Sequence, residues 1–142
     1  MTNKQIDLVK TSWAIVATID PVIVGSLFYN RLFEIAPQLK HMFRNPMPEQ
    51  SKKLLAMINY VISKLDKLED ILDEVAKLAR SHVSYGVKPG HYTIVGEALL
   101  WTLEKGLAEN WNREVKEAWI NCYEILSAAM INASELREQH AA

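Results

Sequence analysis

The chain has little cysteine, no block of like charge and no long apolar run. Cys122 is its one cysteine, so neither an internal disulfide nor a thiolate cluster for a metal can form. Sixteen basic and seventeen acidic residues give a formal net charge of -1, without the basic stripe typical of nucleic-acid or membrane-surface binding. No stretch of about eighteen apolar residues or secretory signal is found. We therefore expect a cytoplasmic protein that binds neither nucleic acid nor membrane.

Strand-like alternation is also missing, and every periodic segment has the period of a helix. The apolar fraction of 49% is enough for a substantial core in 142 residues, so we expect one domain over residues 1–142. The expected inward stripes are Ile6, Val9, Trp13 and Val16; Val24, Leu27, Phe28, Leu32 and Ile35; Leu54, Met57, Ile58, Val61 and Leu65; Ile71, Val75, Leu78 and His82; Tyr92, Val95, Leu99, Leu103 and Leu107; and Val115, Trp119, Cys122, Leu126 and Met130.

Start and stop signals divide these stripes into separate helices. Asp20 followed by Pro21 is an N-cap with proline at the first helical position, and Asn112 has the same capping role for the last helix. Pro37 ends the second helix and opens a very short third one. The polar residues 66–70 are the expected joint between two further helices. The pattern predicts six to seven helices.

His82 is the candidate metal ligand. Val75, Leu78 and His82 follow at spacings of three and four, so they share a helix face that should point inward. Gly86 and Pro89 should end this helix soon after His82. An inward histidine near a helix end is well placed to ligate a metal, although a histidine on an apolar face is more often a hydrogen-bonded core residue.

An all-α chain with one very short, proline-opened helix after the second helix predicts the globin fold. Three segments carry a closer likeness: LFYNRLF at 27–33, PQLKHMF at 37–43, and SH at 81–82 followed by KPGHYTIVGE at 88–97. Across nearly its whole length the chain resembles bacterial single-domain globins and the haem domain of flavohaemoglobins. Residues 95–97 resemble neuroglobin more loosely.

The resemblance implies haem b as cofactor, with His82 as the proximal iron ligand. It places Phe43 against the porphyrin face, where an aromatic side chain suits a mostly apolar cofactor; the simpler alternative is that Phe43 belongs to the core. Gln50 and Leu54, four residues apart, match the distal-helix pair. The other histidines, His41, His91 and His140, are not expected to bind iron.

Tyr29 matches the distal tyrosine of the flavohaemoglobin-like group. Its hydroxyl and the Gln50 amide would donate hydrogen bonds to bound dioxygen, which carries partial negative charge. The ordinary alternatives are a tyrosine bonded to a backbone carbonyl and an exposed glutamine.

On the other side of the haem, the resemblance places Val95 among the cofactor-binding residues and matches Tyr92 to a tyrosine that, with a carboxylate, organises the proximal histidine. The family's glutamate position falls on Leu136 here. Glu135 is one residue early and would point about 100° away on a helix, which leaves the partner of Tyr92 open.

Three functions remain open for such a globin. The first is reversible binding or carriage of dioxygen, with nitric oxide and carbon monoxide as further ligands. The second is nitric oxide dioxygenation, for which we expect a separate reductase because the 142 residues carry no flavin- or nicotinamide-binding signature. The third is gas sensing, and a haem-free helical interaction module is the most distant alternative. The oligomeric state is not predicted.

Overall fold

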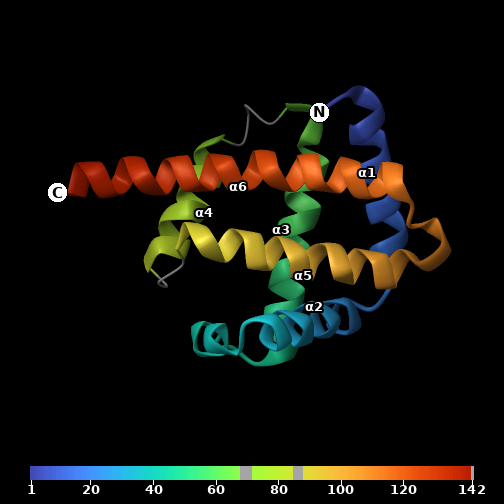
Figure 1. The fold of residues 1–142 in the computed structure, drawn as a ribbon, viewed down its shortest axis with the longest axis horizontal. Coiled ribbons are helices and arrows are strands. Elements are labelled where there is room, and N and C mark those ends of the chain that lie inside the picture. Colours follow the sequence, from blue (N-terminus) through green and yellow to red (C-terminus); the bar gives the residue numbers. More distant parts are fainter. Residues whose placement is uncertain (68–71, 85–87, 142) are drawn as a thin grey trace.

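The computed structural model of the chain describes residues 1–67, 72–84 and 88–141, and the side chains of residues 72, 81–84 and 132–141 lie outside this description. The described ranges hold six α-helices and no strand, which confirms the all-α fold class. In Figure 1, α5 and α6 run side by side, and α3 crosses behind them. The elements are α1 (Asn3–Val16), α2 (Pro21–Ile35), the 3₁₀ helix η1 (Pro37–Met42), α3 (Met47–Ser63), α4 (Leu72–Ser84), α5 (Pro89–Leu107), the 3₁₀ helix η3 (Ala108–Asn110) and α6 (Arg113–Ala141).

The predicted capping residues begin their helices as expected. The Asp20 carboxylate accepts from the Val22 backbone N–H at 2.9 Å at the start of α2, and Asn112 Oδ1 accepts from the Val115 N–H at 2.9 Å at the start of α6. Each bond satisfies a backbone donor that has no partner within the helix. Pro37 opens η1, so the very short helix predicted after α2 is confirmed.

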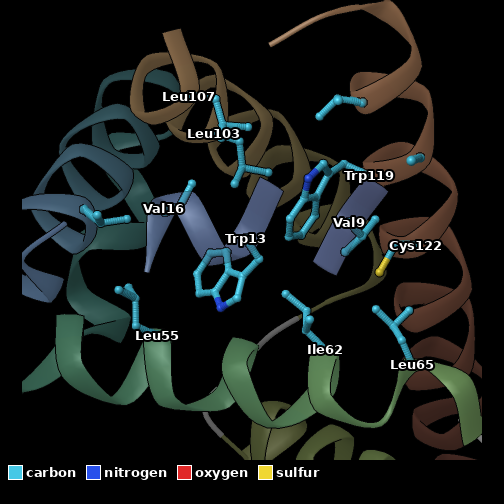
Figure 2. Close-up of a cluster of buried hydrophobic side chains, with 13 residues drawn as sticks. Val9, Trp13, Val16, Leu55, Ile62, Leu65, Leu103, Leu107, Trp119 and Cys122 are labelled. Carbon is cyan, nitrogen blue, oxygen red and sulfur yellow. The ribbon is translucent and has the colours of Figure 1, made fainter. Parts of the chain in front are cut away.

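The main core lies where α1 meets α3, α5 and α6, as Figure 2 shows. Two tryptophans stand at its centre, with the rings of Trp13 and Trp119 6.0 Å apart. Both indole N–H groups are satisfied: Trp119 donates to Ser12 Oγ at 2.9 Å, and Trp13 donates to Asn59 Oδ1 of α3. Buried indoles need such partners, so these bonds fix how α1 sits against α3 and α6.

Helices α2 and α3 approach each other closely at Gly25 and Ser51. A Cβ on Gly25 would lie 2.1 Å from Ser51 Cβ, so only glycine fits at this position. This approach turns the Ser51, Leu55 and Ile62 face of α3 fully inward. The predicted stripe is confirmed for Leu65, which is buried, and for Leu54 and Ile58, which pack against the core; Met57 and Val61 are half-buried.

Helix α4 packs on α6 through Val75 and Ala79, which are buried with Met130. Leu78 packs against the same cluster, so the predicted inward face of α4 is confirmed for its described side chains. The joint before α4 begins at Lys64, two residues earlier than predicted, where α3 ends. Residues 68–71 of this joint lie outside the described ranges.

No single helix among the described residues is both long enough and apolar enough to cross a bilayer. Helices α1 and α2 reach that length and apolarity only together, and this pair is bent by 109°.

Candidate functional site

Tyr29 is fully buried in α2, with 4% of its surface exposed. Its ring packs on three phenylalanines: it lies edge-on to Phe28 and Phe43, with centroid distances of 5.0 Å and 5.1 Å, and is stacked on Phe33 at 6.1 Å. Burial raises the pKa of Tyr29 to about 12. The phenol is therefore protonated at neutral pH and can donate a hydrogen bond. The structure assigns no backbone carbonyl to it among its described hydrogen bonds.

Gln50 lies in the first turn of α3 and is half-buried rather than exposed. Its Oε1 accepts from Asn45 Nδ2 at 2.9 Å. Its side chain lies near the Tyr29 phenol, where it counteracts part of the pKa increase caused by burial. The predicted distal pair is thus brought together. Asn45 was missed, because its position before Pro46 indicated only a chain break.

Phe43, Leu54 and Val95 gather around the same group of buried residues as Tyr29. They come from the segment after η1, from α3 and from α5, and each is half-buried. We call this group the distal cluster; its buried members are Phe28, Tyr29, Leu32, Ala36, Leu39 and Ala98. The structure therefore assembles four of the predicted site residues from four separate segments of the chain.

Tyr92 lies in the first turn of α5 and packs outside the distal cluster. It is half-buried against the cluster of Val75, Ala79 and Met130 that joins α4 to α6. Burial raises the pKa of its phenol. Tyr123 Oη of α6 donates to the Tyr92 carbonyl oxygen at 2.6 Å and so holds this turn.

Sequence reasoning did not find Tyr123. The ring needs Gly96 beside it, since a Cβ there would lie 2.8 Å from Tyr123 Cε2. Tyr92 and Gly96 are four residues apart and therefore share one face of α5. A glycine on that face, which leaves room for a large side chain from another helix, was the only sequence signal for such a contact.

His82 lies in the last turn of α4, as predicted, because α4 ends at Ser84. Its side chain lies outside the described residues, and so do those of Glu135 and Leu136 in α6. The roles of His82 as iron ligand and of Glu135 as a partner for Tyr92 stay predictions. The backbone alone places His82 one turn beyond Leu78, which packs in the same cluster as Tyr92.

The other three histidines of the chain are those not expected to bind iron. His91 Nδ1 accepts from the Lys88 backbone N–H at 3.0 Å at the start of α5, so this ring caps a helix. His41 is exposed in η1. His140 lies outside the described side chains.

The described residues fit a haem between the distal cluster and the α4–α6 cluster. Tyr92 and Val95 are three residues apart on α5, yet they pack against different clusters. Phe43, Leu54 and Val95 offer apolar surface that is only half covered by protein, which suits a flat, mostly apolar cofactor. The polar groups Tyr29 and Gln50 lie at the distal cluster, and Tyr92 lies at the α4–α6 cluster.

Comparison with known proteins identifies the family of this chain. The Globin family model matches residues 26–130. Neuroglobin-1 of Oncorhynchus mykiss is 30% identical over 92% of this chain and 90% of its own length. The flavohemoprotein of Bacillus subtilis is 29% identical over 92% of this chain, which corresponds to 33% of that protein. The structure of a bacterial globin from Campylobacter jejuni superimposes with a TM-score of 0.84 at 28% identity, covering 97% of this chain and 99% of that one.

The chain belongs to the globin family, and the globin fold predicted from the sequence is confirmed. The likeness to flavohaemoglobin haem domains, bacterial globins and neuroglobin is confirmed as well. Membership of this family means that the protein binds haem and, through it, diatomic gases.

Proposed function

We propose that this globin binds dioxygen reversibly at a haem b held by His82. A haem iron with one imidazole ligand supplies an open coordination position for a diatomic gas. The observation that carries the proposal is the Tyr29 phenol, buried in the otherwise apolar distal cluster with Gln50 near it. Nitric oxide and carbon monoxide would bind at the same position.

The chain's own residues supply the selectivity of the pocket. Dioxygen takes on partial negative charge when it binds, so a phenol O–H in a poorly hydrated pocket stabilises it more than it stabilises carbon monoxide. Leu54 and Phe43 exclude water from this side, which strengthens the hydrogen bond. Tyr92 lies at the α4–α6 cluster and is held there by Tyr123, so it would position the proximal histidine.

Spectra of the purified protein in the ferric, ferrous and oxygenated forms test this proposal. We expect an intense haem band in all three forms, and a ferrous spectrum that changes when dioxygen is added and returns when dioxygen is removed. A ferrous form that is oxidised at once, without a stable oxygenated spectrum, would contradict reversible binding.

Nitric oxide dioxygenation is the second candidate, and the likeness to the flavohemoprotein of Bacillus subtilis favours it. In this reaction nitric oxide, dioxygen and one electron give nitrate. The electron must be supplied at every turnover, and we propose a separate reductase as its source.

The rate of ferric reduction decides between the two candidates. Any globin with accessible bound dioxygen can consume nitric oxide once, so a fast single turnover does not discriminate. If dioxygenation is the task, a reductase of the source cell should reduce the ferric protein much faster than free thiols or flavins do. If no cellular reductase exceeds that background, the enzyme role fails and dioxygen binding stands.

A further inference from the structure

Two methionines flank Phe43 in the segment that joins η1 to α3. Met42 is the last residue of η1, and Met47 is the first residue of α3. Both are half-buried, and both pack against the distal cluster together with Phe43. Each methionine therefore touches the distal cluster and still keeps part of its surface in solvent.

Apolar packing attaches this segment to the rest of the protein. Among the described residues, no side chain caps the N-terminus of η1 or of α3. The described hydrogen bonds of residues 43–46 all reach partners within residues 40–50, so none of them ties the segment to α2 or α5. The Phe43 ring itself contacts Tyr29 at 5.1 Å and Phe33 at 5.6 Å, measured between ring centroids. The position of Phe43 thus depends on the apolar character of its neighbours.

We propose that Met42 and Met47 form a reversible oxidation site, at which a hydroperoxide converts their thioethers to sulfoxides and so loosens the segment that holds Phe43. The methionine sulfur attacks one peroxide oxygen, so that a sulfur–oxygen bond forms and the oxygen–oxygen bond breaks. Sulfur loses two electrons to the peroxide. The other peroxide oxygen takes the proton of the transferred oxygen and leaves as water or an alcohol.

The sulfoxide changes the packing because it is polar where the thioether is apolar. A polar group set against the distal cluster costs free energy unless it finds a hydrogen-bond partner or turns to solvent. When either methionine turns outward, Phe43 loses a neighbour that holds its segment in place. We expect the haem to dissociate faster as a result. The inference goes beyond gas binding and needs only the haem that membership of the globin family implies.

Peptide mass spectrometry after treatment with hydrogen peroxide locates the oxidised residues. The haem-loaded ferrous carbon monoxide form is the sample, because its iron position is already occupied. Met42 and Met47 should gain one oxygen atom each well before Met130, which is buried between α4 and α6. Met42 and Met47 that stay unoxidised until Met130 reacts would overturn the proposal.

Transfer of haem to an excess of a haem-free globin measures the consequence. Oxidation should accelerate haem loss from the wild type by about three- to tenfold. The double variant Met42→Leu with Met47→Leu keeps apolar side chains of similar volume and should show no acceleration. Met57→Leu is the matched control, because Met57 is half-buried on α3 but is not packed on the distal cluster, and it should respond as the wild type does. Equal acceleration in the double variant would place the effect elsewhere and refute the site.

Two further measurements separate sulfoxide formation from damage to the haem. Methionine sulfoxide reductases A and B together reduce both sulfoxide epimers, so their addition should restore slow haem loss; an acceleration that persists would contradict a reversible site. Met42→Gln with Met47→Gln introduces polar side chains without peroxide and should lose haem as fast as the oxidised wild type, whereas an unchanged rate would contradict the proposal. A protein that retains haem but does not bind dioxygen would refute the proposed function and leave these measurements intact.

Discussion

Gly25 of α2 lies so close to Ser51 of α3 that a methyl group on the glycine would stand 2.1 Å from Ser51 Cβ and Oγ. This contact places Tyr29, one turn further along α2, beside Gln50 at the start of α3. The distal donors therefore depend on a backbone contact that lies outside the pocket.

Gly25→Ala should lower the free energy of unfolding by about 1–3 kcal/mol, because the added methyl group forces the two helices apart. Chemical denaturation of the wild type and the variant measures this difference. Gly90→Ala is the matched control, since a Cβ at Gly90 meets no atom within 4 Å. Equal losses in both variants would show that the contact between α2 and α3 is not the cause.

Two buried serines should respond in opposite ways to the same substitution. Ser51 Oγ is fully buried and has no described hydrogen-bond partner, so Ser51→Ala should stabilise the protein by roughly 1 kcal/mol. Ser12 Oγ accepts from Trp119 Nε1, and Ser12→Ala leaves a buried indole N–H unpaired, at a cost of about 1–3 kcal/mol. Thermal unfolding of both variants checks the signs. Destabilisation by Ser51→Ala would mean that Ser51 has a partner in solution.

Tyr29→Phe should accelerate dioxygen dissociation by about ten- to a hundredfold, because a hydrogen bond to a charged acceptor contributes roughly 1.5–3 kcal/mol. Carbon monoxide carries less charge when bound and should respond much less. Stopped-flow displacement of each gas measures the two rates, with Tyr60→Phe on the exposed side of α3 as control. Equal effects on both gases would show that Tyr29 acts by its shape.

The buried thiol predicts how stability changes at alkaline pH. Burial raises the pKa of Cys122 from its ordinary value of 9.0 to about 11. Between these two values the unfolded chain has lost the thiol proton and the folded chain has kept it, so stability falls as pH rises. The loss from this group approaches about 1.4 kcal/mol per pH unit. Denaturation of wild type and Cys122→Ala from pH 7 to 10.5 should show a shallower decline in the variant, and parallel declines would contradict the assignment.

The helices were predictable from the sequence because their signals are local. Asp20 and Asn112 cap their helices, Pro37 opens η1, and Val75 with Leu78 marks the inward face of α4. Each of these features depends on residues within one or two turns. The resemblance to globins then predicted which residues surround the distal cluster.

The remaining features depend on contacts between distant segments, which periodicity does not carry. The close approach of α2 and α3 requires the absence of a side chain at Gly25, so periodicity within α3 did not predict the fully buried positions Ser51 and Leu55. The bond from Tyr123 to the Tyr92 carbonyl joins residues 31 positions apart.

Visible absorption spectra of the wild type, His82→Ala and the control His41→Ala, recorded in the ferric, ferrous and oxygenated forms, test the central claim most directly. The wild type and His41→Ala should show an intense haem band and a reversible change with dioxygen. His82→Ala should lose most of its haem while keeping the helical content of a haem-free globin. Full haem retention in His82→Ala with an unchanged ferrous carbon monoxide spectrum would contradict the account, and so would a wild-type protein that shows no haem band when supplied with haem.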